Sequence, residues 1–175
     1  MLKTDFTLAP VTEPDFALLR EMAGTIWRQH YTGIVSAAQV NYMLAARFSN
    51  ESLREYLQPA DNWLELLWGS GAPVGYCACE LADIGGNDPS PPAMKLGQLY
   101  VLDSHRGMGL GRFMLGHIET RARRLGRHVL WLQVNKLNTG AIEFYKSAGF
   151  EVAREAVFEI GGGFVMDDYV MQKTV

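Results

Sequence analysis

The feature that most constrains this chain is a glycine-rich corner between a strand-like and a helix-like segment. Apolar, β-prone residues run from Leu99 to Leu102, and after a polar stretch glycines stand at Gly107, Gly109 and Gly111. An amphipathic run with the period of a helix follows, from about Arg112 to Leu125. This order predicts a strand, a tight turn and the N-terminus of a helix.

Such a corner suits an anion, because alternating glycines expose backbone N–H groups and a helix N-terminus adds unpaired donors and a positive dipole end. Phosphate is the anion most often bound this way. Close packing alone would also explain the glycines. The sequence contains no G-x-x-x-x-G-K-[ST] motif, and a G-x-G-x-x-G motif with an acidic residue about 20 positions later is also missing. A P-loop and NAD binding are therefore disfavoured.

The composition is that of a folded globular protein, and 175 residues suit a single domain over 1–175. The net charge of −3 argues against a nucleic-acid partner. No apolar run approaches the roughly 18 residues that cross a bilayer, and the first residues lack a signal-peptide core. We therefore expect no membrane partner and a cytoplasmic location. Cys77 and Cys79 are expected to be reduced core residues, with no metal site.

Hydrophobic periodicity and turn residues predict the other elements. The expected strands are Phe6–Pro10, Asn62–Trp68, Pro73–Leu81, Met94–Leu102, Val129–Val134, Phe150–Ile160 and Phe164–Gln172. Helices are expected from Thr12 to Tyr31, over Ser36–Phe48 and Asn50–Leu57, from Gly109 to Leu125 and from Asn138 to Gly149, with an exposed loop over Asp83–Pro92. The helix after the corner is expected to bury Phe113, Leu115, Ile118, Ala122 and Leu125.

The strand before the corner, the helix after it and the next strand form a β-α-β unit, whose two strands should be parallel. Hairpin signals make the other neighbours antiparallel. The predicted fold class is α/β (α+β): a mixed, largely antiparallel sheet of about seven strands with a central parallel β-α-β pair, flanked by helices.

Two motifs resemble the GCN5-related N-acetyltransferase (GNAT) superfamily. The first, Arg106–Gly111, fits the [QR]-x-x-G-x-[GA] turn after a strand and before a helix. The second fits N…N-x-x-A-x-x-x-Y-x-x-x-G-F and comprises Asn135, Asn138, Ala141, Phe144, Tyr145, Gly149 and Phe150. The resemblance covers about Met94–Val152, a third of the chain, and the order of strands and helices extends it loosely to both ends. The two-helix region before the first hairpin loosely resembles polyamine and small-amine acetyltransferases of this superfamily.

The resemblance implies acetyl-CoA as donor and a primary amine as acceptor. Backbone N–H groups of the corner would hold the CoA pyrophosphate, with Arg106 and Arg112 as additional charges. The residues of this cradle are Arg106, Gly107, Met108, Gly109, Leu110, Gly111 and Arg112. Leu99, Tyr100 and Val101 would pair with the acetyl-pantetheine arm along a strand edge that splays from the next parallel strand. The N–H of Val101 would polarise the thioester carbonyl.

The resemblance also implies roles for two residues of the second motif. Tyr145 matches the tyrosine that protonates the departing CoA thiolate as general acid. Asn138 matches an asparagine that contacts CoA, and it also suits a helix N-cap. The acetyl group would pass directly to the amine in a ternary complex, because neither cysteine belongs to a motif.

The general base is where the chain departs from the family pattern. Gln133 occupies the position at which related N-terminal acetyltransferases often carry a glutamate, and an amide cannot accept the ammonium proton. Glu80, Asp167, Asp168 and a chain of waters remain alternatives, and none is assigned.

The acceptor also stays open. An acidic set could attract a cationic amine, namely Asp61, Glu65, Asp167 and Asp168. A group on the first two helices either lines an acceptor pocket or packs the helix pair: Trp27, His30, Tyr31, Gln39 and Tyr42. The acceptor is a small molecule such as a polyamine, or a protein lysine or N-terminus. A non-catalytic acyl-CoA-binding module on the same fold is the alternative, and a homodimer is compatible with either.

Overall fold

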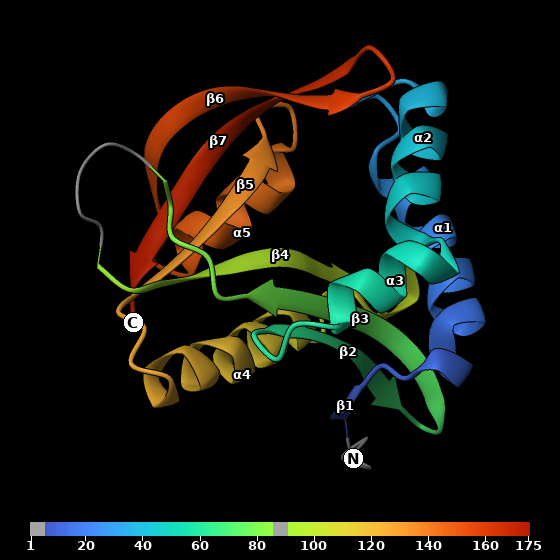
Figure 1. Ribbon diagram of the computed structural model, residues 1–175, viewed down its shortest axis with the longest axis horizontal. Helices are drawn as coiled ribbons and strands as arrows, with labels where there is room; N and C mark the ends of the chain where they lie inside the picture. The colour runs from blue at the N-terminus through green and yellow to red at the C-terminus, as the bar shows by residue number, and fades with distance from the viewer. Residues whose placement is uncertain (1–5, 86–90) are drawn as a thin grey trace. The chain divides into compact units, whose positions relative to one another are not determined.

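The elements expected from the sequence are present in the computed structural model, which describes residues 6–85 and 91–175 (Figure 1). The strands are β1 (Thr7–Pro10), β2 (Asn62–Gly69), β3 (Ala72–Glu80), β4 (Ala93–Val101), β5 (Val129–Asn135), β6 (Glu151–Gly161) and β7 (Phe164–Thr174). The helices are α1 (Phe16–His30), α2 (Ala37–Phe48), α3 (Asn50–Leu57), α4 (Leu110–Arg124) and α5 (Thr139–Ser147), with 3-10 turns η1 (Glu13–Asp15) and η2 (Asp103–His105). Half of the predicted loop Asp83–Pro92 lies outside the described residues.

The strands form one mixed sheet in the order β1-β2-β3-β4-β5-β7-β6. The β4–β5 ladder is parallel, and those of β1–β2, β2–β3, β5–β7 and β6–β7 are antiparallel. This confirms the predicted fold class. Contacts divide the chain into two units, one with residues up to Glu80 and Gln98–Gly116, the other with Leu81–Gly97 and His117–Val175. That the whole chain is one domain stays a prediction.

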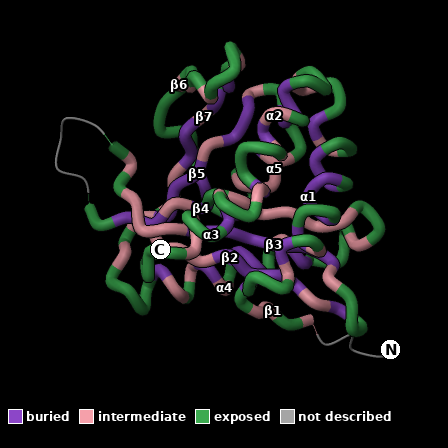
Figure 2. The backbone as a smooth tube through the Cα atoms, turned by 45° about the vertical axis from the view of Figure 1, so that its right-hand side comes forward, coloured by how far each residue is buried: buried purple, intermediate pink, exposed green. Residues whose placement is uncertain are grey.

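In the first unit, β3 is buried almost along its whole length, as Figure 2 shows, and Cys77 and Cys79 are buried within it and are not joined by a disulfide. The predicted apolar stripe of α1 is buried from Phe16 to Trp27. The N-cap expected at Ser36 is present, since its Oγ accepts a hydrogen bond from the N–H of Gln39 at 3.1 Å. Local sequence signals therefore placed both helices correctly.

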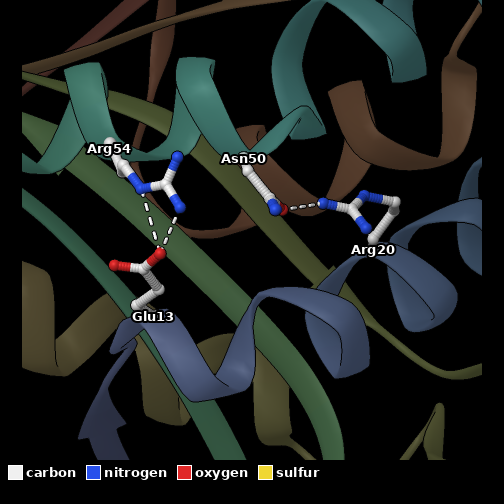
Figure 3. A network of polar contacts seen from close by, with 4 residues as sticks. All are labelled: Glu13, Arg20, Asn50 and Arg54. Atoms are coloured by element: carbon white, nitrogen blue, oxygen red, sulfur yellow. Dashed lines mark hydrogen bonds and ion pairs between the residues drawn. The ribbon is translucent and has the colours of Figure 1, made fainter.

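A polar network ties α1 to α3 on the surface of the first unit (Figure 3). Arg54 Nε donates to Glu13 Oε1 at 3.0 Å, and Arg20 Nε donates to the carbonyl of Phe48 at 2.8 Å. Arg20 also bonds to the side chain of Asn50. Because the Glu13–Arg54 pair is exposed, it orients the helices more than it stabilises them.

In the second unit, β5 is mostly buried and pairs with β7, whose other neighbour is the largely exposed edge strand β6. The core on one face of this sheet contains Ala93, Trp131 and Val170. Trp131 Nε1 donates to the carbonyl of Ala82 at 2.7 Å, so its only polar atom is satisfied. The continuous apolar run of β5 was a correct indicator of a strand covered on both faces.

The predicted inward face of α4 needs correction. Phe113 and Leu125 are 47% and 43% exposed, whereas Leu110 and Met114 are buried together with the expected Leu115, Ile118 and Ala122. The buried stripe follows the spacing 110, 114, 118 and 122, which leaves Phe113 and Leu125 on its flanks. Within the described residues, none of the helices is both long and apolar enough to cross a bilayer.

Candidate functional site

The glycine-rich corner has the order that its sequence predicts: β4 ends at Val101, η2 follows, and α4 begins at Leu110. Gly107 and Gly109 have φ angles of 77° and 78°, in the left-handed region. Among the described residues, no atom lies within 4 Å of a Cβ built on either glycine. Backbone conformation rather than crowding therefore requires glycine at both positions.

The start of α4 offers backbone donors at this corner. Phe113 N–H donates to the carbonyl of Gly109 at 3.0 Å, which is the first bond of the helix. The N–H groups of residues 109–112 precede it and have no acceptor within the helix, and the positive end of the helix dipole lies with them. Arg112 is exposed beside these donors. The geometry fits a bound phosphate or pyrophosphate.

Arg106 brings a second positive charge to the corner, and Asp103 partly balances it. Its Nε lies 2.8 Å from Asp103 Oδ1, and the two side chains are 53% and 50% exposed. An exposed pair of this kind is weak, so an anionic ligand can compete with Asp103 for the guanidinium. The structure thus places Arg106 and Arg112 at the same corner.

The end of β4 is fixed by close contact with β3. A Cβ built on Gly75 would lie 2.5 Å from the carbonyl oxygen of Tyr100 and 3.3 Å from Cα of Val101. Leu102 N–H donates to the carbonyl of Val74 at 2.9 Å. Because a side chain at position 75 would push β4 away, Gly75 sets the backbone position of Tyr100 and Val101.

The parallel ladder of β4 and β5 is short. It pairs Ala93 with Val129, Met94 with Leu130 and Lys95 with Trp131. Beyond these three pairs, β4 continues to Val101 and β5 to Asn135. The pairing described for the two strands therefore ends well before Leu99–Val101.

The side chain of Tyr100 belongs to an aromatic cluster that joins α1 to the sheet. Its ring centroid lies 5.4 Å from that of Tyr76, 5.8 Å from Trp27 and 5.9 Å from His30, and its hydroxyl lies 2.8 Å from that of Tyr31. Trp27 Nε1 donates to Tyr76 Oη at 2.7 Å. Trp27 and Tyr76 are fully buried and pack the unit together, so packing accounts for that part of the predicted cluster.

His30 differs from its aromatic neighbours because its ordinary pKa lies near neutral pH. The half-buried ring lies edge-on to Tyr31, with centroids 5.0 Å apart. Burial lowers the pKa of His30 below its usual 6.5, the positive charge of Arg106 lowers it further, and Asp103 opposes these effects. The imidazole is therefore mainly neutral at pH 7.

Asn138 and Tyr145 lie in the second unit. Asn138 Oδ1 accepts from the N–H of Ala141 at 3.3 Å, which confirms the predicted N-cap of α5. Tyr145 is partly buried on α5, and its ring lies 5.2 Å from that of Phe144 and 5.5 Å from that of Phe150. These contacts fix the phenol ring on the helix.

Comparison with known proteins identifies the family. The sequence model of the acetyltransferase (GNAT) family matches residues 25–150, which include the corner, β5 and α5. The chain belongs to this family. GNAT acetyltransferases use acetyl-CoA as co-substrate, which agrees with a corner suited to pyrophosphate.

Relatives and solved structures agree with this assignment. The chain is 35% identical over 82 residues to an N-acetyltransferase of Methanocaldococcus jannaschii, covering 47% of this chain and 36% of that protein. It is 28% identical over 105 residues to an N-acetyltransferase of Lactobacillus delbrueckii subsp. lactis, covering 60% of each. It thus spans between about a third and three fifths of these relatives. PaiA N-acetyltransferase from Thermoplasma acidophilum in complex with coenzyme A has the same fold, with a TM-score of 0.79 and 20% identity over 98% of this chain and 99% of that one.

The structure shows the surroundings of each carboxylate that could serve as the general base, and it selects none of them. Asp167 Oδ1 lies 2.6 Å from Lys136 Nζ, which also contacts Glu155 at 2.7 Å. Asp167 is therefore engaged in an ion pair. Asp168 is buried in β7, and Glu80 is half-buried at the end of β3.

That the acidic set attracts a cationic acceptor stays a prediction, and its four members differ in exposure and pairing. Glu65 and Asp168 are buried, Asp167 is paired with Lys136, and only Asp61 of the four is both exposed and outside this ion pair. Sequence reasoning also missed Tyr76 and Gln98 beside Tyr100. Strand alternation was the available signal, because Gln98 and Tyr100 are two residues apart and share a face.

Proposed function

We propose that the protein transfers an acetyl group from acetyl-CoA to a primary amine by direct attack in a ternary complex. The observation that carries this proposal is the corner at Gly107 and Gly109, whose left-handed backbone leads into the first turn of α4. Backbone groups would form this anion site, and the protein belongs to the GNAT family.

The donor would be held by backbone groups. N–H groups of residues 107–112 bind the pyrophosphate, and Arg106 and Arg112 add charge-assisted hydrogen bonds. Leu99, Tyr100 and Val101 pair with the pantetheine arm, a role supported by the early end of the β4–β5 ladder. Val101 N–H then donates to the thioester oxygen, where negative charge develops as the amine attacks.

Tyr145 would supply the proton for the departing sulfur. As the C–N bond forms and the C–S bond breaks, its hydroxyl donates to the thiolate, a step that water performs less well. Asn138 would contact CoA in addition to capping α5. The support for both roles is the spacing of the family motif and the fixed position of the phenol between Phe144 and Phe150.

The acceptor we favour is a polyamine or another small primary amine. The alternatives are a protein lysine or N-terminus, and a module that binds acyl-CoA without catalysis. A cytoplasmic location and a homodimer stay predictions.

Thiol release with acetyl-CoA tests the proposal, using spermidine, an L-amino acid, an aminoglycoside and a lysine peptide as acceptors. We expect turnover with at least one amine and calorimetric binding of CoA in its absence. Binding of CoA without thiol release above background with any amine would support the non-catalytic alternative. A protein that ignores CoA in calorimetry contradicts the whole proposal.

A further inference from the structure

We propose that Asn135 and Lys136 are positioning residues, which hold the start of α5 so that Tyr145 can donate its proton to the departing sulfur. The inference rests on the proposed function, because Tyr145 is the general acid assigned there. It follows from three features of the second unit: the short loop between β5 and α5, the contacts that fix this loop, and the course of α5 from the loop to Tyr145.

The loop that leads into α5 is short and has a mostly exposed apex. It comprises residues 136–138, between the end of β5 at Asn135 and the start of α5 at Thr139. Leu137 is 64% exposed, so burial of its side chain does not anchor the loop. Asn138 is engaged as the N-cap of the helix. The place of the helix start therefore depends on the polar contacts of Asn135 and Lys136.

Asn135 fixes the turn from its buried side. Its exposure at the end of β5 is 8%. Its Oδ1 accepts a hydrogen bond from the N–H of Leu137 at 2.9 Å, and its carbonyl accepts one from the N–H of Asn138 at 2.9 Å. An asparagine whose side chain bonds the backbone two residues later forms an Asx turn. Asn135 belongs to the second motif of the sequence, and this turn gives it a role.

Lys136 ties the same turn to the two strands of the C-terminal hairpin. Its N–H donates to the carbonyl of Asp167 on β7 at 3.0 Å. Its Nζ lies 2.6 Å from Asp167 Oδ1, 2.7 Å from Glu155 Oε2 on β6 and 5.7 Å from the centroid of the Tyr169 ring. Hydrogen bonds to Asp167 and Glu155 raise the pKa of Lys136 above its usual range, so the ammonium stays charged. The main chain and the side chain of one residue thus hold the loop at several points.

The helix carries a displacement of this turn to Tyr145. Ile142 N–H donates to the carbonyl of Asn138 at 3.0 Å, which is the first bond of the helix ladder. Tyr145 lies seven residues after Asn138, two helical turns later on the same side of α5 and about 10 Å along the axis. A catalytic group that is misplaced by about 1 Å can lose a factor of about 100 in rate. Asn135 and Lys136 therefore act on the reaction through Tyr145 and need not contact the reacting atoms.

A double-mutant cycle on kcat tests this role, using thiol release at saturating acetyl-CoA with an amine that the wild-type protein acetylates. We expect Lys136→Met to lower kcat about tenfold, and Lys136→Arg, which keeps the charge, to retain most of the activity. In a Tyr145→Phe background, Lys136→Met should have no further effect, because the group that it displaces is already gone. Lys146→Met removes an exposed lysine from α5 itself and is the matched control, with kcat unchanged. Wild-type turnover of Lys136→Met, or full additivity with Tyr145→Phe, would overturn the assignment.

Two further variants keep the test independent of folding. Asn135→Ala removes the acceptor of the Asx turn, and its loss of kcat should also be absent in the Tyr145→Phe background. If Lys136→Met lowers Tm, Glu155→Gln replaces it, because this exposed residue weakens the same contact; Glu159→Gln, also exposed on β6, is its control. A wild-type protein that turns over while all these variants match it refutes the positioning role alone. A wild-type protein inactive with every amine refutes the proposed function with it.

Discussion

The contact between β3 and β4 at Gly75 makes the most direct prediction about how the fold serves the site. Gly75→Ala adds a Cβ that would lie 2.5 Å from the carbonyl oxygen of Tyr100, where ordinary contact begins at 3.4 Å. The carbonyl oxygen belongs to the backbone and the position of the Cβ is fixed by the backbone, so no side-chain rotation relieves the clash. The two strands must separate locally by roughly 1 Å.

That displacement has two measurable effects. Overpacking of this kind costs about 1–3 kcal/mol of unfolding free energy. For a chain of this length, about 2 kcal/mol lowers Tm by roughly 4–8 °C. A shift of about 1 Å in the N–H of Val101 would also misplace the proposed oxyanion donor, which we expect to lower kcat about 100-fold.

Thermal denaturation and thiol release on the same preparations test both effects. Gly116→Ala is the control, because it lies within α4 and no described atom comes within 4 Å of the added Cβ. Alanine in a helix interior should stabilise the protein by about 0.5–1 kcal/mol. The reasoning fails if Gly75→Ala melts like the wild type and retains its kcat.

Three further predictions concern the site. Tyr145→Phe should lower kcat by about 100-fold or more while the Kd for acetyl-CoA in calorimetry stays unchanged; unchanged turnover removes Tyr145 from the mechanism. Gly109→Val should abolish CoA binding, since a β-branched residue strongly disfavours φ of 78°, and retained micromolar affinity would contradict the main-chain cradle. Because the pKa of His30 is lowered by folding, its neutral form stabilises the protein above about pH 6.5 and this contribution is lost as the pH falls. The Tm of the wild type should therefore drop more between pH 7 and pH 5 than that of His30→Gln, and parallel melting curves would show that folding does not shift this pKa.

The corner could be predicted because its information is local. Positive φ angles at Gly107 and Gly109 need glycine whatever surrounds them, and strand and helix periods on either side fix the order of elements. The caps at Ser36 and Asn138 were predictable for the same reason, since each acts on an N–H three residues away.

The buried face of α4 was less predictable, because hydrophobicity alone does not say where the centre of a stripe lies. Phe113 and Leu125 are apolar enough to be buried, yet the four-residue spacing that begins at Leu110 takes the core positions. Long apolar side chains on the flank of a stripe lie half-covered at the surface. Sequence gives the width of such a face more reliably than its centre.

The surroundings of Tyr100 could not be predicted, because they depend on strand register between segments far apart in the chain. Tyr76, Trp27 and His30 reach Tyr100 from β3 and α1, and no local pattern encodes that meeting. Strand geometry also explains why backbone and side chains of β4 can make different contacts. A strand directs its backbone groups sideways within the sheet and its side chains perpendicular to it. The N–H of Val101 and the side chain of Tyr100 therefore point in different directions from adjacent positions, so one short segment can offer its main chain to a ligand while its side chain packs against Trp27 and His30.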